Sequence, residues 1–242
     1  MARIENSTTR VCLVTGASGT LGSAFCEAYG KKYRIVAVHF LNDLTVCNQN
    51  QCLVDPLEPS ARLARNEIKV FSVRADLRSD AELERVVELA LARFGKIDLL
   101  VNGASYTVLA PMLHSDDLLN SLGEQFQLHV YVPLKLATLI AKMFWRDRVE
   151  ENRRLRRNII NISSTSGTIV YPGLGQGGYA ACKSALEQLT RHMALEFASI
   201  GIRVNAVSPN SFPTRVPTKR VLDEIREIDR NEVTGEIRMI EA

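Results

Sequence analysis

Short hydrophobic runs alternate along the chain with longer segments whose apolar residues recur every three or four positions. The short runs are apolar throughout, which is typical of strands buried on both faces of a parallel sheet. Such strands are expected at Val11–Thr15, Ile35–Phe40, Val70–Val73, Leu99–Asn102, Ile159–Ser163 and Val204–Ser208. With helices between them, the pattern predicts an α/β fold: a doubly wound parallel sheet of the Rossmann kind in three α/β/α layers.

Two of the longer segments have a clear helical period, and each is followed by a glycine that would stop a helix. They run from Leu83 to Phe94 before Gly95 and from Leu186 to Phe197 before Gly201. Two more helices and a last strand are expected at Leu21–Tyr29, Val221–Ile228 and Gly235–Ile240. Pro133 lacks an N–H group and should kink the helix that follows the fourth strand.

The composition is that of a soluble globular protein, and 242 residues suit a single domain over residues 1–242. The net charge of +3 is too small to indicate a nucleic acid or an anionic membrane as a partner. No apolar run reaches transmembrane length, and the start of the chain carries no signal core. The 5 cysteines show neither a disulfide pattern nor a metal-binding set, which predicts reduced thiols in a cytoplasmic protein without a metal site.

Two stretches interrupt this pattern. The segment Asn42–Asn66 is rich in Asn, Gln and Pro and is long for a connection after a second strand. The segment Arg146–Arg157 is strongly charged and immediately precedes a predicted strand, which places it at the amino edge of the sheet. A basic cluster can bind phosphate or nucleic acid, but the ligand crevice of such a fold lies at the carboxyl edge. We therefore interpret the arginine cluster as solvated surface.

A glycine-rich turn, Thr15–Gly22, joins the first strand to the first helix. Glycines here allow a tight turn and a close approach of pyrophosphate to the backbone, and the start of the helix offers free N–H groups to an anion. The order of strand, turn and helix favours nucleotide binding over a turn that merely connects two elements.

Tyr179 and Lys183 are four residues apart, so one helical turn places them on the same face. A phenol titrates near ~10, and a neighbouring ammonium group favours the phenolate and lowers this pKa. The pair is a candidate proton-transfer group, with Ser164 upstream as its partner. Alone this spacing is common on solvated helices, and it gains weight from the glycine turn and from Ser164.

Together and in this order, the motifs resemble the short-chain dehydrogenase/reductase family over nearly the whole chain. The amino-terminal motif is matched at Thr15, Gly16 and Gly22, whereas Thr20 stands at the family's middle glycine and Gly19 is expected to supply the flexibility. The later motifs are matched at the ends of successive strands. The matching residues are Asp76 and Leu77, Asn102 and Ala104, Ser164 and Gly167, Tyr179 and Lys183, and Pro209 and Thr214, with Asn210 at a usual glycine.

The resemblance implies hydride transfer between a nicotinamide cofactor and a carbonyl or alcohol, chiefly reduction of a ketone or 3-oxoacyl-type carbonyl. Tyr179 would exchange the proton, Ser164 would bind the same oxygen, and Lys183 would lower the Tyr179 pKa and hold the nicotinamide ribose. His129 replaces a fourth catalytic residue, an asparagine that supports a water chain. Either His129 makes this relay titrate near neutral pH, or the backbone carries the contact and the substitution is tolerated; we favour the second interpretation.

The cofactor contacts that the resemblance implies fall on the glycine turn, on the strand ends and on the catalytic pair. They are Gly16, Ser18, Thr20, Leu21, Gly22, Phe40, Asp76, Leu77, Asn102, Ala104, Tyr179, Lys183, Pro209 and Thr214. No acid ends the second strand, where NAD-dependent members pair one with the ribose hydroxyls, and no arginine arrives there to bind a 2′-phosphate. This favours NADP(H) slightly and leaves NAD(H) open.

The substrate lid of the family is shortened here, because few residues follow Thr214. A short lid predicts an open site for a bulky or carrier-tethered small-molecule carbonyl. The loop from Tyr171 to Gly178 is slightly longer than in the family and rich in glycine, which predicts a mobile rim. Tyr171 is either a substrate contact or a surface aromatic.

The resemblance also implies a homodimer or homotetramer. A second interpretation is a regulatory or scaffold protein that binds a nucleotide but has little catalysis. The departures at Thr20, Asn210 and His129 and the short lid favour this interpretation, whereas the intact Ser164, Tyr179 and Lys183 oppose it.

Overall fold

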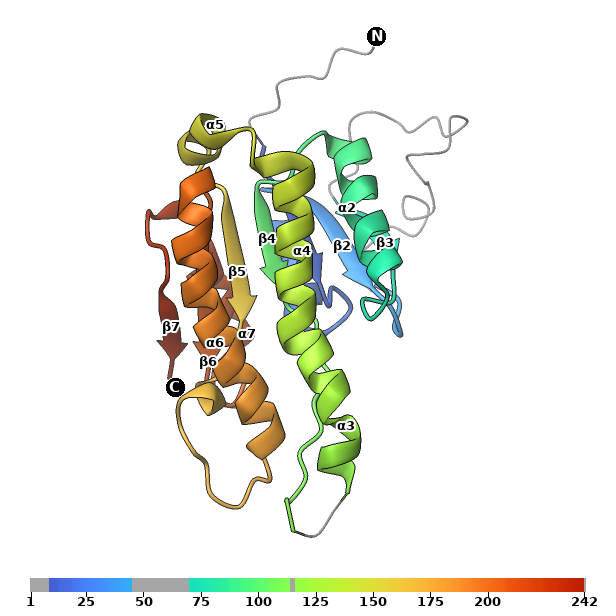
Figure 1. Ribbon diagram of the computed structural model, residues 1–242, viewed down its shortest axis with the longest axis vertical. Helices are drawn as coiled ribbons and strands as arrows, with labels where there is room; N and C mark the ends of the chain where they lie inside the picture. The colour runs from blue at the N-terminus through green and yellow to red at the C-terminus, as the bar shows by residue number, and fades with distance from the viewer. Residues whose placement is uncertain (1–8, 45–69, 114–115, 242) are drawn as a thin grey trace.

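One parallel sheet with the strand order β3-β2-β1-β4-β5-β6-β7 forms the centre of the computed structural model, which describes residues 9–44, 70–113 and 116–241 (Figure 1). The strands are β1 (Val11–Thr15), β2 (Arg34–His39), β3 (Val70–Arg74), β4 (Leu99–Asn102), β5 (Asn158–Ile162), β6 (Arg203–Pro209) and β7 (Ile237–Ile240). Each pair of neighbouring strands is parallel. The predicted strands are confirmed to within a residue or two at their ends.

Helices cover both faces of this sheet, which confirms the doubly wound, three-layer prediction. On one face α2 (Asp80–Phe94), α4 (Val132–Ile140) and α6 (Gly177–Phe197) lie side by side (Figure 1). On the other face α1 (Thr20–Tyr29) contacts α7 (Thr218–Arg230). The shorter elements are α3 (Asp117–Phe126), α5 (Val149–Arg154), the π-helical turns η2 (Gln127–Tyr131) and η3 (Ala141–Trp145), and the 3-10 turns η4 (Thr165–Gly167) and η5 (Ala198–Ile200).

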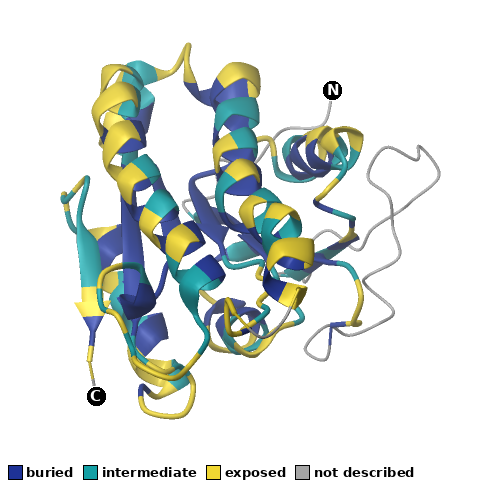
Figure 2. Cartoon of the chain, turned by 60° about the horizontal axis from the view of Figure 1, so that its bottom comes forward, coloured by how far each residue is buried: buried dark blue, intermediate teal, exposed yellow. Residues whose placement is uncertain are grey.

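Two apolar layers separate the sheet from its helices. Val11 and Leu13 of β1 belong to the layer under α2, α4 and α6, whereas Cys12 and Val14 belong to the layer under α1 and α7. Both faces of the strand are therefore buried, which explains its apolar sequence. In Figure 2 the helices turn buried sides toward the sheet and exposed stripes outward.

The helix after β4 departs from α-helical geometry just before Pro133, where a kink was expected. In η2 the Val132 N–H bonds to the Gln127 carbonyl, five residues back instead of four. Pro133 then falls in the first turn of α4, where a missing N–H costs little. The π-helical turn is thus the form that the expected distortion takes.

Within the described ranges, no helix is long and apolar enough to cross a membrane, and no group of His, Cys, Asp and Glu is arranged to hold a metal ion. The thiols of Cys12, Cys26 and Cys182 are free and buried. Cys47 and Cys52, like most of the Asn42–Asn66 stretch, lie outside the described residues.

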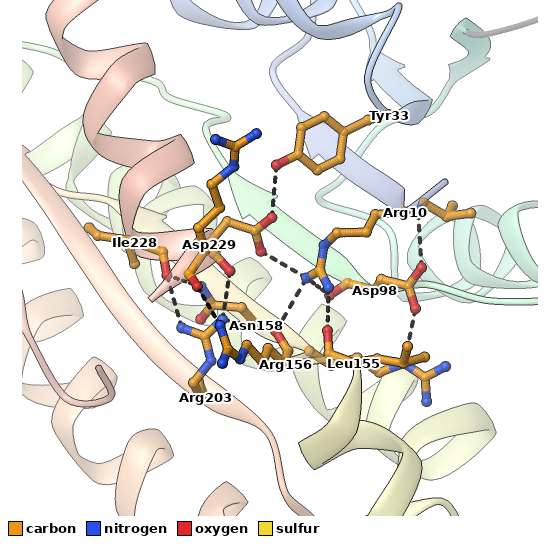
Figure 3. Close-up of polar contacts among 12 residues, drawn as sticks. Arg10, Tyr33, Asp98, Leu155, Arg156, Asn158, Arg203, Ile228 and Asp229 are labelled. Atoms are coloured by element: carbon orange, nitrogen blue, oxygen red, sulfur yellow. Dashed lines mark hydrogen bonds and ion pairs between the residues drawn. The ribbon is translucent and has the colours of Figure 1, made fainter. Parts of the chain in front are cut away.

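A buried polar network closes the amino edge of the sheet (Figure 3). Arg157, which is 0% exposed just before β5, donates to Asp98 at 3.1 Å. Arg10 and the Tyr33 hydroxyl donate to the two oxygens of Asp229 in α7, each at 2.8 Å. The arginine cluster does lie at this edge, but the expectation of solvated surface is wrong for Arg157, because its paired carboxylates allow the charge to be buried.

We expect Asp98→Ala to lower the free energy of unfolding by about 3–5 kcal/mol, because the buried Arg157 cation loses the one of its two carboxylate partners that is itself buried and keeps only the part-exposed Glu151. Urea denaturation followed by circular dichroism measures this loss. Glu150 pairs with Arg153 on the surface, so Glu150→Ala is the matched control and should change the stability little. Equally small losses in the two variants would show that the network does not stabilise the amino edge.

Candidate active site

The carboxyl ends of the strands open into a cavity of about 710 Å³. Most of the residues expected to bind a cofactor line it: Gly16, Ser18, Thr20, Leu21, Gly22, Phe40, Asp76, Leu77, Ala104 and Pro209. So do Ser164, Tyr179 and Lys183. The chain leaves β1 toward β2 on one side and β4 lies on the other, so the cavity sits where the strand order reverses, as the fold predicts.

Steric constraints in the turn after β1 require two of its glycines. A Cβ on Gly16 would lie 2.7 Å from the Gly103 carbonyl oxygen, and one on Gly22 would lie 2.3 Å from that of Gly16. Gly16 also has a φ of 70°, which favours glycine. Thr20 begins α1 with its side chain exposed, so the change from glycine leaves the turn intact. Gly19, with φ −76° and ψ 172°, adopts a conformation open to any residue and is not the source of flexibility that was expected.

This turn gives the cavity a wall made mostly of small residues, Gly16, Ser18, Gly19 and Thr20, at the start of α1. The first N–H groups of a helix have no intrahelical partner, and the positive end of the helix dipole lies there. A pyrophosphate group therefore fits this wall. The cavity continues from the turn past Phe40 and Asp76 on one side and to Ser164 on the other, so its shape and donors fit a dinucleotide.

Three side chains from different elements meet at the other end of the cavity. Tyr179 lies in the first turn of α6, and the buried Lys183 follows one turn later with its Nζ 5.5 Å from the centre of the Tyr179 ring. This Nζ donates to the Ile162 carbonyl at 2.7 Å. Ser164 follows β5, lines the cavity together with Tyr179, and accepts the Ser166 N–H at 3.2 Å. The sequence-predicted catalytic trio is thus brought together.

Burial is the largest influence on the pKa values of Tyr179 and Lys183. It raises the pKa of Tyr179, and the hydrogen bond with Ser164 offsets only part of the effect. The pKa of Tyr179 is therefore raised overall, although the nearby Lys183 was expected to lower it, because desolvation outweighs the other effects. Burial also lowers the pKa of Lys183, to about 8. Tyr179 therefore keeps its proton at neutral pH.

Motif reasoning missed Glu187, a buried carboxylate one turn after Lys183. It accepts hydroxyl groups of Ser163 at 2.9 Å, Ser208 at 3.0 Å and Thr168 at 3.0 Å. These residues stand at the end of β5, in β6 and after η4, so Glu187 connects α6 to the segments around the site. The available signal was a charged residue at an apolar position of the α6 pattern.

His129, which η2 carries, packs beneath Tyr179 and does not line the cavity. It is 1% exposed, and its ring meets the Tyr179 ring edge-on with the centres 5.6 Å apart. Its Nε2 lies 2.9 Å from the Tyr106 carbonyl, which only accepts, so Nε2 carries the proton. Burial and, secondly, the charge of Lys183 lower the pKa of His129 to about 3. A relay through His129 that titrates near neutral pH is therefore wrong.

Two sequence-predicted cofactor residues do not reach the cavity. The Asn102 side chain is buried and donates to Asn161 Oδ1 at 2.8 Å, so it links β4 to β5. Thr214 is exposed, and its hydroxyl donates to the Ser211 carbonyl at 2.7 Å. Both side chains bond their own neighbours instead of facing a ligand.

A charged cluster that sequence reasoning missed closes the cavity near β2 and β3. The Arg78 guanidinium lies 5.7 Å from the centre of the Phe40 ring. It donates to Asp76 at 2.8 Å and to Glu124 at 2.8 Å. Arg78 was detectable as a neighbour of Asp76, but Glu124 comes from α3 and meets it only through the fold.

Comparison with known proteins gives a matching family model, two similar proteins and a similar solved structure. The family model described as short chain dehydrogenase matches residues 10–224. The chain is 28% identical over 218 residues to Glucose 1-dehydrogenase 2 of Bacillus subtilis (strain 168), covering 89% of this chain and 78% of that protein. It is 28% identical over 240 residues to a 3-oxoacyl-[acyl-carrier-protein] reductase of Synechocystis sp., covering 96% of this chain and 89% of that protein. A solved short chain dehydrogenase from Leptospira borgpetersenii with bound NAD+ has a TM-score of 0.74 at 19% identity, covering 96% and 91%.

The buried imidazole predicts an acid-sensitive fold. Unfolded His129 titrates near 6.5 and folded His129 near 3, so the unfolded state binds the extra proton between these values and stability falls below pH 6.5. His129→Asn should lose less free energy of unfolding between pH 6.5 and about 4.5 than the wild type does in urea titrations. His192 is exposed, so His192→Asn should keep the wild-type pH dependence. If the stability of His129→Asn fell with pH as steeply as that of the wild type, His129 would not be the source of the acid sensitivity.

Proposed function

The chain belongs to the short-chain dehydrogenase/reductase family, and from this membership we propose that it reduces a ketone or 3-oxoacyl-type carbonyl to an alcohol with a nicotinamide cofactor. The observation that carries the proposal is the meeting of Ser164, Tyr179 and Lys183 at one end of the cavity. The other end has the glycine turn that fits a pyrophosphate. A proton donor and a dinucleotide-sized cavity thus adjoin each other.

Tyr179 holds the proton that the alcohol product needs. Its raised pKa keeps the phenol protonated at neutral pH, so it gives this proton to the carbonyl oxygen during reduction. The Ser164 hydroxyl donates to the same oxygen and stabilises the charge that develops there. When bound, the nicotinamide supplies the hydride that the carbonyl carbon accepts.

Lys183 assists the proton transfer by Tyr179. Its ammonium group, one turn along α6, favours the phenolate that remains once the proton has left. Its pKa of about 8 lets it exchange a proton near neutral pH. We assign to the same Nζ the ribose hydroxyls of the cofactor, which the family resemblance implies.

Tyr179→Phe should lower carbonyl turnover at least ~100-fold, because it removes the proton donor and keeps the ring. Steady-state kinetics measures the turnover, and a fluorescence titration should show that NADPH still binds. Tyr131→Phe removes a hydroxyl that bonds Asp80 at the surface and serves as the control with near-parental rates. Turnover of Tyr179→Phe at the parental rate would remove Tyr179 from the mechanism.

We also propose NADP(H) as the preferred form of the cofactor. Phe40 follows β2 and lines the cavity, so no carboxylate from that position repels a 2′-phosphate. The Arg78 guanidinium lies over the Phe40 ring and has N–H groups beyond those that bond Asp76 and Glu124. A 2′-phosphate would share this guanidinium with the two carboxylates.

Arg78→Gln should weaken NADPH binding about tenfold and leave NADH binding nearly unchanged, because only NADPH carries the phosphate that the cation contacts. Fluorescence titrations of the purified protein give both dissociation constants. Arg85 pairs with Glu82 on α2 outside the cavity, so Arg85→Gln is the control. Parallel losses for the two nucleotides, or tighter binding of NADH by the wild type, would contradict the preference.

A regulatory or scaffold protein of the same fold with little catalysis is the second candidate. The observation that favours it is the failure of the Asn102 and Thr214 side chains to reach the cavity. Tight binding of NADPH without turnover of any carbonyl in a broad panel would support it. The homodimer or homotetramer and the cytoplasmic location remain predictions.

A further inference from the structure

Two loops form the mouth of the cavity beside the catalytic trio. One follows β4 over residues 105–113, and the other precedes α6 over residues 171–176. Leu109 and Leu174 line the cavity, yet they are 51% and 53% exposed. Large apolar side chains at the mouth of a cavity present a surface that gains stability when a ligand covers it.

The two loops are bonded to each other. The Ala110 N–H donates to the Gly175 carbonyl at 2.9 Å. A Cβ on Gly175 would lie 2.9 Å from the Ala110 carbonyl carbon, and a Cβ on Gly177, the first residue of α6, would meet the Met112 side chain. The glycine-rich rim, whose mobility stays a prediction, thus contacts the neighbouring loop through Gly175, with Leu109 and Leu174 next in sequence to the bonded residues.

Charge in the cavity lining falls in two places, at the Lys183 ammonium group, which donates to the Ile162 carbonyl, and in a cluster beside Phe40. Of its acidic and basic lining residues, Asp76, Arg78 and Glu124 bond one another next to Phe40. Near the mouth the described lining offers no carboxylate or guanidinium group. The lining residues of the two loops are Ser105, Tyr106, Thr107, Leu109, Tyr171, Leu174 and Gln176.

Two polar side chains of the second loop, Tyr171 and Gln176, are neutral and already bonded. The Tyr171 hydroxyl donates to Thr165 Oγ1 at 3.0 Å, and Gln176 Oε1 accepts the Ser166 hydroxyl at 3.0 Å. A carboxylate or phosphate placed here would lose water without gaining a counter-charge, which is costly. An alkyl or aryl group would lose only its contact with water, which is favourable.

We propose that this apolar lip, formed by Leu109 and Leu174 on the bonded loops, selects an uncharged carbonyl compound with a hydrophobic arm. The inference rests on the proposed reductase function and adds the substrate class. A small oxo acid is the competing class, and it is an outcome of the test.

The test compares 2-octanone with 7-oxooctanoate, which has the same carbon chain and a terminal carboxylate, in NADPH oxidation by the wild-type protein. We expect kcat/KM to favour 2-octanone at least ~100-fold, since the carboxylate finds no partner at the lip. Equal or better turnover of 7-oxooctanoate would contradict the proposed selectivity of the lip and would still support the reductase function. Turnover of neither compound, with NADPH bound, would count against both proposals.

Two glycines in the second loop give a matched pair of variants. Gly175 has a φ of 58° and its Cβ would clash with Ala110, whereas Gly173 has a φ of 75° and its Cβ would meet nothing within 4 Å. Gly175→Ala should separate the loops and raise KM for 2-octanone about tenfold more than Gly173→Ala does, with the Kd for NADPH unchanged in both. Equal effects would show that the junction does not form the substrate site.

Leu174→Lys tests the charge preference without relying on the glycines. The ammonium group would supply the missing counter-charge, so the kcat/KM ratio of 7-oxooctanoate to 2-octanone should rise at least ~10-fold. Leu195 is exposed on α6 away from the cavity lining, so Leu195→Lys is the matched control and should keep the wild-type ratio. An unchanged ratio in Leu174→Lys would contradict the proposal.

Discussion

The buried carboxylate of Glu187 is the contact on which the geometry of the candidate site depends. Ser163, Thr168 and Ser208 all donate hydroxyl groups to it from three segments around the catalytic centre. A desolvated carboxylate needs such donors, so these segments are held at fixed positions around α6. Ser164 adjoins one of these donors, and Glu187 thereby fixes the serine relative to the tyrosine and lysine on the same helix without touching the cavity.

Much of the fold could be predicted because its determinants are local. An apolar run predicts a strand when both of its faces are buried, and β1 shows this directly. Gly16 and Gly22 could be found because backbone atoms occupy the space of their missing side chains. Tyr179 and Lys183 could be paired because four residues make about one helical turn.

What could not be predicted depends on contacts between residues distant in sequence. Burial raises the pKa of Tyr179 and lowers that of His129, and a sequence motif does not show which residues are buried. The sequence predicted that Arg157 is a surface charge, because only the fold places Asp98 beside it. The Arg78 cluster and the junction between the two rim loops likewise form only in the folded chain. Sequence motifs therefore predicted the family and the candidate catalytic residues, whereas the pKa shifts and the contacts around the cavity required the folded structure.

The proposal that the catalytic trio transfers a proton while the cofactor transfers a hydride is tested most directly by isotope transfer. NADPH deuterated at the transferable C4 position would be incubated with the wild-type protein and 2-octanone, and the product would be analysed by mass spectrometry. We expect 2-octanol that carries the deuterium on its carbinol carbon. Recovery of unlabelled ketone while NADPH is bound at the site would contradict the proposed chemistry and favour a nucleotide-binding protein without turnover.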